Sequence, residues 1–418
     1  MKNRINEFIK ITEGEKVALI DPIGKVCLGV SKKLEDNLDR PEVQKKLYPI
    51  WRKQTEFVKQ IEENREKINT VYLMVTRKCN MNCNFCSMSA NEEMCLEKEF
   101  KLEDIKSKVV PFLQKSKPHR LIITGGEPLI KHQIVEIVQV LRYELNCFIT
   151  LQSNGLAITL DLIKQLKGLI DEIDFSTKHM FESPEKESQL SDHIEMCQQA
   201  GIKVVLSFIY EKTNEEDLYK LIDIVAKYDI EVLFSIVSAV GRAKKNSVIL
   251  TDIEHIDMNL KIAKYILQQG YEDKNIGRGF YQRIQVRNSC GGYGKIMAIF
   301  PEGNIYMCQC MEKSQVKLGN ILTDDKQMVF DKLDLLLHNH EIKKIFCVEH
   351  KEICKECNYR YICGGRCAAA ADTYDCQCLY VKTMLNYVLF YYNVRHGRRQ
   401  NLQTFTNYLE SIMKEYRV

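Results

Sequence analysis

The chain has 418 residues, of which 45% are hydrophobic and 28% charged. This is the composition of an ordinary globular protein with enough apolar material for a sizeable core. Its 60 basic and 56 acidic residues nearly cancel, to a net charge of +4, so composition favours neither nucleic acid nor a membrane as partner. No run of 18 apolar residues and no apolar signal-peptide core occur. We therefore expect neither export nor membrane insertion, and a cytoplasmic location.

The first 70 residues predict a short β-hairpin followed by charged, helical sequence, which together make an N-terminal α+β extension. Residues 71–285 then alternate apolar runs of strand length with amphipathic helical stretches. The expected strands are 71–75, 120–124, 148–152, 172–176, 204–209 and 232–237.

This alternation predicts an α/β fold with parallel strands and right-handed crossovers. Six units are too few for a closed eight-stranded barrel, so we expect a partial (β/α)6 TIM-like barrel. Its ligand site should lie at the carboxyl ends of the strands.

Residues 286–380 are rich in Cys and Gly and contain only short β-like pieces. We expect a small domain with little apolar core of its own, which needs metal to hold it together. Residues 381–418 predict a C-terminal helical tail whose tyrosines belong to the core.

Seventeen cysteines are unusual for a chain with no export signal. In a reducing compartment they indicate metal binding or catalysis rather than disulfides. Three lie within residues 79–86 and ten within residues 290–378. Cys27, Cys95, Cys147 and Cys197 are scattered, and we expect them to be buried core thiols.

The first group has the spacing C-x3-C-x2-C through Cys79, Cys83 and Cys86, directly after the first expected barrel strand. Three thiolates on one loop can bind three corners of a 4Fe–4S cubane and leave the fourth iron without a protein ligand. An open metal position is where a substrate can bind. Zinc is the alternative, but it would require a fourth ligand at zinc-finger spacing, which is missing.

These cysteines, with Phe85 before the last of them, resemble the radical S-adenosylmethionine (SAM) superfamily. The likeness continues in order along the barrel, with GGE at the end of the second strand, QSNG after the third and DFST after the fourth. It implies that the first motif contacts the methionine amino group, and the other two the methionine carboxylate or the ribose. The candidate SAM contacts are Gly125, Gly126, Glu127, Ser153, Asn154 and Ser176.

The resemblance also implies a reaction. SAM chelates the open iron, the reduced cluster delivers one electron, and a 5′-deoxyadenosyl radical abstracts a substrate hydrogen. An electron donor such as flavodoxin or ferredoxin would supply the electron. The cofactor carries the difficult chemistry and the protein positions it. No catalytic acid, base or hydrogen donor can be named from the sequence.

The second group contains C-x2-C-x5-C-x3-C through Cys354, Cys357, Cys363 and Cys367, hereafter the cysteine quartet. With Cys290, Cys308 and the VGRA segment (240–243), it resembles the SPASM extension of peptide-modifying superfamily members. The resemblance implies two auxiliary 4Fe–4S clusters, three clusters in all. The first auxiliary cluster takes Cys290, Cys308 and Cys367, and the second takes Cys354, Cys357, Cys363 and either Cys376 or Cys378.

One point about the first auxiliary cluster stays open. Its fourth ligand is either Cys310 or absent, and an open iron there would suit a substrate thiolate. Cys347 is spare.

The sequence therefore predicts a radical SAM enzyme that modifies a ribosomally made precursor peptide, with a thioether or carbon–carbon crosslink favoured. One alternative is an anaerobic sulfatase maturase forming formylglycine, but Gln309 stands where that group has an Asp base. Another is a zinc-stabilised binding protein without catalysis. Residues 1–70 are either a peptide-recognition element that offers a strand edge or a plain extension packed on the barrel. His179 and Arg242 are expected either to contact substrate or to lie on the solvated surface.

Overall fold

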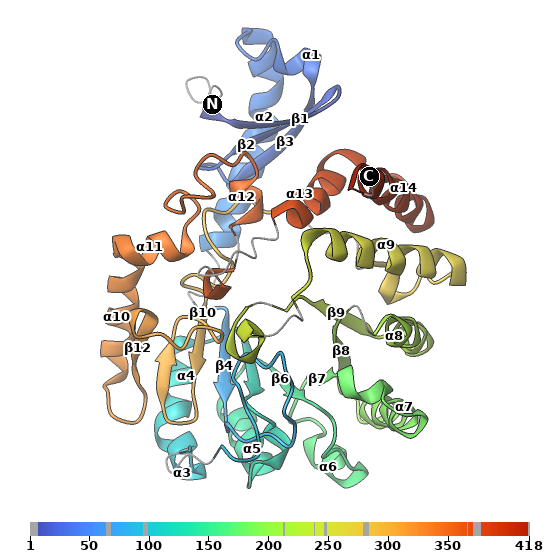
Figure 1. Cartoon of the computed structure of the whole chain (residues 1–418). Coiled ribbons are helices and arrows are strands. Elements are labelled where there is room, and N and C mark those ends of the chain that lie inside the picture. Colours follow the sequence, from blue (N-terminus) through green and yellow to red (C-terminus); the bar gives the residue numbers. More distant parts are fainter. Residues whose placement is uncertain are drawn as a thin grey trace.

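The computed structural model describes residues 7–63, 68–94, 99–211, 214–237, 239–245, 249–278, 284–365, 367–370 and 378–416. Its strands form a three-stranded sheet at the N-terminal end and a nine-stranded sheet that makes the body of the molecule (Figure 1). None of the helices in these residues is long and apolar enough to cross a membrane.

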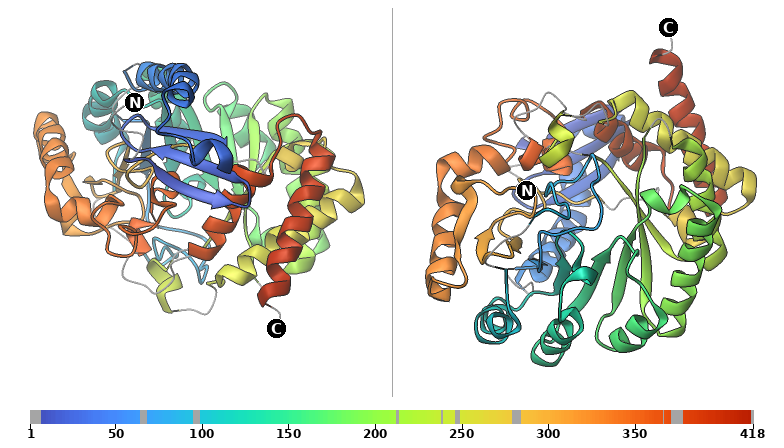
Figure 2. Two further views of the ribbon diagram at one scale, coloured as in Figure 1. Left: turned by 90° about the horizontal axis from the view of Figure 1, so that it is seen from above. Right: turned by 60° about the horizontal axis from the view of Figure 1, so that its bottom comes forward.

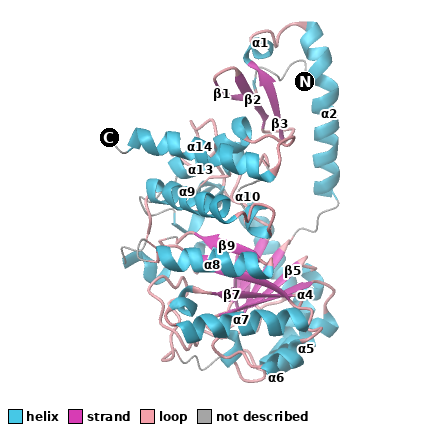
Figure 3. Ribbon diagram, turned by 90° about the vertical axis from the view of Figure 1, so that its right-hand side faces the viewer, coloured by secondary structure: helices cyan, strands magenta, loops and turns pink. Residues whose placement is uncertain are grey.

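The small sheet has the order β1 (Ile9–Glu13), β2 (Lys16–Asp21), β3 (Val26–Ser31), with both pairs antiparallel. The predicted hairpin is β2–β3, and the sequence prediction missed β1. The short α1 (Lys32–Glu35) and the long α2 (Pro41–Glu63) follow. Val17, Leu19 and Leu28 form a separate small core with Leu47 of α2. Figure 3 shows this unit at one end of the molecule, with α2 standing beside the strands.

Six parallel strands form the partial barrel, in the order in which they occur in the chain, so the predicted fold class is confirmed. The helices that connect them lie on the outside of the curved sheet (Figure 2). The strands are β4 (Thr70–Met74), β5 (Arg120–Thr124), β6 (Phe148–Ser153), β7 (Glu172–Ser176), β8 (Lys203–Ile209) and β9 (Glu231–Ser235). The main helices are α3 (Leu102–Asp104), α4 (Val110–Ser116), α5 (Ile134–Glu144), α6 (Leu160–Leu166), α7 (Pro184–Gln199), α8 (Glu215–Tyr228) and α9 (Asp252–Gln269).

The two faces of the barrel strands differ in chemistry because side chains alternate along a strand. Ile173 and Phe175 of β7 are fully buried in the main core. Asp174, between them, points to the other face and accepts a hydrogen bond from Gln152 Nε2 of β6 (3.0 Å). The inner face of the barrel therefore carries polar side chains at this level of β6 and β7.

The last three strands, β10 (Ile296–Ile299), β11 (Asn304–Tyr306) and β12 (Lys317–Asn320), extend the barrel sheet. β10 pairs with β4 in parallel, Met297 opposite Val71, although the two are more than 200 residues apart in the chain. Met297, Ile299 and Ile305 are buried in the same core as the barrel. The apolar residues of this segment thus pack on the barrel rather than on one another.

The remaining helices are α10 (Lys326–His338), α11 (His340–Phe346), α12 (Arg360–Cys363), α13 (Cys378–Asn386) and α14 (Arg398–Tyr416). α14 lies along α9 (Figure 1) and forms an ion pair with it, Lys264 Nζ to Glu410 Oε1 (2.6 Å). Tyr387 and Tyr408 are buried, as predicted for the tail. A second small core joins Ile11 and Ile20 of the N-terminal sheet to Cys354, Ile362 and Leu385. The N-terminal sheet therefore rests on the cysteine quartet.

Candidate functional site

Cys79, Cys83 and Cys86 lie on the loop that follows β4, residues 76–90, which we call the cluster loop. They open onto a cavity of about 420 Å³ at the carboxyl ends of the barrel strands, the strand-end cavity. Its other lining residues are Met81, Phe85, Ser87, Thr124, Gly126, Glu127, Gln152, Ser153, Asn154, Asp174, Ser176, Ser207, Ile209, Ile236, Val237, Val240 and Cys310. Five of the six predicted SAM contacts are among them, and Gly125 is not.

The two glycines after β5 are required by the close approach of the cluster loop. Gly126 N donates to Thr76 O and Glu127 N donates to Lys78 O, both at 2.8 Å. A Cβ on Gly126 would lie 2.0 Å from Lys78 O, and one on Gly125 would lie 2.4 Å from Thr76 O. The glycines thus let two backbone segments touch, which the sequence did not reveal.

The carboxylate of Glu127 is buried and fully engaged by the protein. It accepts hydrogen bonds from Ser153 Oγ (2.9 Å), Asn154 N (2.7 Å) and Leu129 N (3.0 Å). Burial raises the pKa of Glu127, and these donors oppose that rise. Glu127 therefore ties the end of β5 to the end of β6 and fixes Ser153 and Asn154 beside the cluster loop.

Asn154 connects this framework to the cysteines. Its Nδ2 donates to Asn80 Oδ1 (2.8 Å) and lies 4.0 Å from Cys79 Sγ. In the ligand-free loop, burial raises the pKa of the Cys79 thiol to about 11. Because a metal ligand must be the thiolate, cluster binding at this loop has to displace protons.

Arg242 holds the cluster loop from the opposite side. Its Nε donates to Cys83 O (2.6 Å), a terminal nitrogen donates to Ala90 O (2.9 Å), and its backbone N donates to Cys86 O (3.1 Å). Gly241 has φ +57, and a Cβ there would lie 2.3 Å from Cys86 O. From the sequence we expected Arg242 to contact substrate or to lie on the surface, and we missed its role in holding the cluster loop. The VGRA segment that contains it was the feature of the sequence that pointed to this position.

His179 was also expected to contact substrate or solvent. It is 3% exposed, so a solvated surface role is wrong, and it does not line the strand-end cavity. Burial lowers its pKa, which favours a neutral imidazole in the core.

Asp174 provides a buried acceptor in the same cavity. It is 6% exposed, and Gln152 Nε2 donates to its Oδ2. Its Oδ1 is buried and has no hydrogen-bond partner in the part of the chain that the structure describes. Burial raises the pKa of this carboxyl, against hydrogen bonds from Ser207 and Gln152. A ligand with an N–H or O–H donor would satisfy Oδ1.

Cys310 is the one described lining residue of this cavity that follows residue 285. Its backbone N donates to Cys308 Sγ (3.4 Å), and its thiol lies within electrostatic range of Cys290 and Cys367. Cys290, Cys308 and Cys367 are thus neighbours of Cys310, and of these four only Cys310 is among the described residues that line the strand-end cavity. Cys347 is buried next to Tyr293, and its backbone forms a bridge with Ser289, the residue before Cys290.

The cysteine quartet lies in short turns and the single-turn α12. Cys357 N donates to Cys354 O (2.9 Å), and the Cys363 thiol is in electrostatic range of both. Cys367 is exposed and Cys378 begins α13. Cys376, the other candidate for the last position, and the scattered Cys95 lie outside the described residues.

The donor set of the cluster loop, three cysteine thiols, suits an iron–sulfur cluster. Within the described ranges, no three Cys, His, Asp or Glu side chains are gathered closely enough to hold one metal ion. A cubane spaces its thiolate ligands more widely than one ion does, and thiolates are its usual ligands. The three cysteines of the cluster loop also face a cavity, as a cluster with one open iron requires.

Comparisons with known proteins agree with this geometry. The Radical SAM superfamily profile matches residues 73–225. GTP 3',8-cyclase of Clostridium perfringens (strain SM101 / Type A) is 24% identical, over 66% of this chain and 94% of that protein.

Two solved structures share the fold. One is anSMEcpe with bound AdoMet, which has a TM-score of 0.56 at 16% identity and covers 83% of this chain and 99% of that one. The other is Streptococcus suis SuiB bound to precursor peptide SuiA, with a TM-score of 0.54 at 15% identity, covering 94% and 98%. Residues 73–225 thus match a radical SAM domain, the catalytic domain of a superfamily of enzymes that bind a 4Fe–4S cluster and S-adenosylmethionine.

Proposed function

We propose that this enzyme modifies a ribosomally made precursor peptide, with a thioether or carbon–carbon crosslink as the favoured product. The observation that carries the proposal is the meeting of the cluster loop and Cys310 in one cavity. Structures with the same fold hold a peptide, namely SuiB with SuiA and anSMEcpe with the Cp18Cys peptide.

The lining of the strand-end cavity argues against a nucleoside triphosphate as substrate. None of its described lining residues is Lys, Arg or His, whereas phosphate groups are normally bound by such cations. Formylglycine formation is disfavoured because Gln309, not an Asp, follows Cys308.

Cys79, Cys83 and Cys86 would hold the cluster that binds SAM. Bound there, the cluster and SAM supply the 5′-deoxyadenosyl radical chemistry of the superfamily. The chain's own groups position these ligands. Asn154 aims an amide donor at Cys79, Ser153 and Ser176 line the cavity, and Asp174 Oδ1 accepts a hydrogen bond from the ligand or substrate. The apolar residues beside them limit the access of water to the radical.

Two auxiliary 4Fe–4S clusters complete the proposal. The first uses Cys290, Cys308 and Cys367, and the second uses Cys354, Cys357, Cys363 and either Cys376 or Cys378. The placement of Cys310 beside Cys308 supports it as fourth ligand of the first cluster, while its place in the cavity lining would equally suit a free thiol beside an open iron. Cys310→Ala separates these. An unchanged iron content supports the open site, and loss of the cluster ends it.

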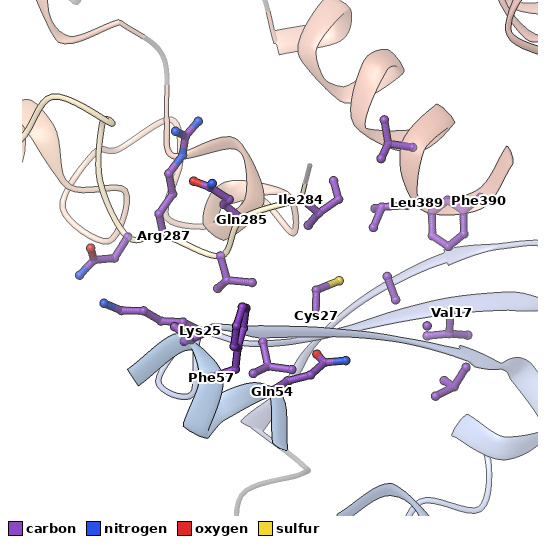
Figure 4. Close-up of a pocket in the computed structure, with 18 of the residues that line it drawn as sticks. Val17, Lys25, Cys27, Gln54, Phe57, Ile284, Gln285, Arg287, Leu389 and Phe390 are labelled. Atoms are coloured by element: carbon purple, nitrogen blue, oxygen red, sulfur yellow. The ribbon is translucent and has the colours of Figure 1, made fainter. Parts of the chain in front are cut away.

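A second cavity offers a place for the rest of the peptide. This N-terminal groove, of about 1000 Å³, lies between β2, β3 and α2 on one side and residues 284–295 and 388–390 on the other (Figure 4). Among the described strands β3 pairs with β2 alone, so its other edge can accept an added strand. Four basic residues, Lys16, Lys25, Arg287 and Lys295, line the groove against Glu15 and Glu62. These features support docking of an extended, acidic peptide segment.

The proposal is tested with anaerobically purified enzyme, SAM, a reductant such as reduced flavodoxin, and candidate precursor peptides taken from short open reading frames near the gene. We expect 5′-deoxyadenosine and a peptide lighter by two hydrogens, as a crosslink requires. Unchanged mass with deuterium uptake would show epimerisation instead, and an untouched peptide alongside SAM cleavage would contradict a peptide substrate. Cys79→Ala is the control and should abolish both products.

Docking is tested separately. Phe57 of α2 lines the N-terminal groove and is 51% exposed. We expect Phe57→Ala to weaken peptide binding about tenfold and to leave SAM cleavage unchanged. Tyr143→Ala, at an exposed aromatic residue of α5 away from the groove, should change neither.

A further inference from the structure

Arg77 lies between β4 and Cys79, and its guanidinium is held by two carboxylates from far along the chain. It is 8% exposed. A terminal nitrogen donates to Glu302 Oε1 (2.8 Å) and Nε to Glu302 Oε2 (3.3 Å), while the terminal nitrogens also donate to both oxygens of Glu312. The ring of Phe300 lies 5.0 Å from the guanidinium carbon. We call Arg77, Glu302 and Glu312 the Arg77 bridge.

The bridge joins the two cysteine-bearing loops that meet in the strand-end cavity. Arg77 precedes Cys79 by two residues, and Glu312 follows Cys310 by two. Glu302 lies in the turn between β10 and β11. On the opposite side of Arg77, its backbone N donates to Glu99 Oε1 (3.2 Å).

The bridge also continues the sheet beyond its last pair. The parallel β4–β10 ladder ends where Leu73 lies opposite Ile299. Arg77 comes four residues after the first of these and Glu302 three residues after the second, so the side chains connect the two segments where the backbone ladder has stopped. Cys310, two residues before Glu312, lines the strand-end cavity together with Cys79.

We propose that Arg77 is a positioning residue that, through Glu302 and Glu312, holds Cys310 and the first auxiliary cluster loop at a fixed distance from the SAM-binding cluster. The inference rests on the proposed clusters. A planar guanidinium that binds two carboxylates at once fixes their orientation as well as their separation, which a lysine ammonium cannot do. Without the paired hydrogen bonds of this guanidinium, the segment that carries Cys310 and Glu312 is held less firmly against the cluster loop.

The test is made on reconstituted, dithionite-reduced holoenzyme by electron paramagnetic resonance. Two paramagnetic clusters at a fixed short distance broaden each other's signals. We expect the wild type to show this broadening and Arg77→Lys to lose part of it, with an unchanged iron content of about 12 per chain. Glu312→Gln is the second variant, in case Arg77→Lys assembles its clusters poorly. Its carboxylate is 43% exposed, and the substitution should cause the same loss of broadening.

Arg142→Lys is the matched control. Arg142 is a half-buried arginine that donates to Leu169 O (2.9 Å) and Cys147 O (3.1 Å), and it lies on the outer layer in α5. It should keep the broadening. Broadening that is equal in wild type, Arg77→Lys and Glu312→Gln would overturn the positioning role alone. A wild-type enzyme with only about 4 iron per chain would overturn the auxiliary clusters, and the inference with them.

Discussion

The two cysteine regions of the molecule are built differently. The cluster loop is fixed by the protein on three sides, through Gly126 and Glu127 from β5, Asn154 from β6 and Arg242 after β9. The cysteine quartet lies in turns and a four-residue helix, packed between the N-terminal sheet and α13. We infer that the cluster loop keeps its shape without metal, as suits a site that must also bind SAM, whereas the quartet depends on its cluster.

The largest effect is expected where a side chain would enter the contact between β5 and the cluster loop. Gly126→Ala places a Cβ 2.0 Å from Lys78 O. We expect a loss of about 3 kcal/mol of unfolding free energy and loss of the SAM-binding cluster, measured by thermal unfolding and iron content. Gly397→Ala, where a Cβ meets nothing within 4 Å, should change neither. Full iron content in Gly126→Ala would show that the loop is not fixed by this contact.

A smaller effect is expected from Arg242→Ala, which removes the side-chain hydrogen bonds to Cys83 O and Ala90 O. At this half-buried site each hydrogen bond contributes about 1 kcal/mol, so the cluster loop should bind its cluster more weakly. The readout is the rate at which a chelator removes iron, together with 5′-deoxyadenosine formation. The exposed Arg395→Ala serves as control. Equal rates of iron release from Arg242→Ala and wild type would show that the Arg242 hydrogen bonds do not stabilise cluster binding.

Removing the metal compares the two regions directly. After iron chelation, we expect hydrogen exchange of residues 347–365 to lose about 2 kcal/mol of protection, roughly a 30-fold rise in rate. Residues 71–79 should lose much less, because β4 is paired on both sides, with β5 and β10. Equal loss of protection in both regions would contradict the idea that the cysteine quartet depends on metal more than the cluster loop does.

The smallest effect is a pH-dependent one at Asp174. Burial raises its folded-state pKa, so its ionisation destabilises the folded chain. That penalty is absent below the ordinary carboxyl pKa of about 4 and grows as the pH rises through the folded-state value. We expect Asp174→Asn to match the ligand-free wild type near pH 4 and to be more stable by about 1 kcal/mol at pH 8. Unfolding curves with the wild type more stable at pH 8 would show that Oδ1 is satisfied.

The sequence predicted what local patterns encode. Strand–helix alternation gave the partial barrel, and the spacing of Cys79, Cys83 and Cys86 gave the cluster loop. It missed contacts between distant segments. The pairing of β10 with β4 and the Arg77 bridge join residues more than 200 positions apart, and no periodicity reports such a pair. Arg242 was noted in the sequence, but its role depends on where the chain after β9 returns to the cluster loop.

The measurement that tests the central claim most directly is the iron and sulfide content of the anaerobically purified protein, together with its release of 5′-deoxyadenosine from SAM on reduction. We predict a brown protein with about 12 iron and 12 sulfide per chain. A variant with Cys79, Cys83 and Cys86 replaced by alanine should retain about 8 iron and form no 5′-deoxyadenosine. A colourless protein that holds zinc would contradict the account.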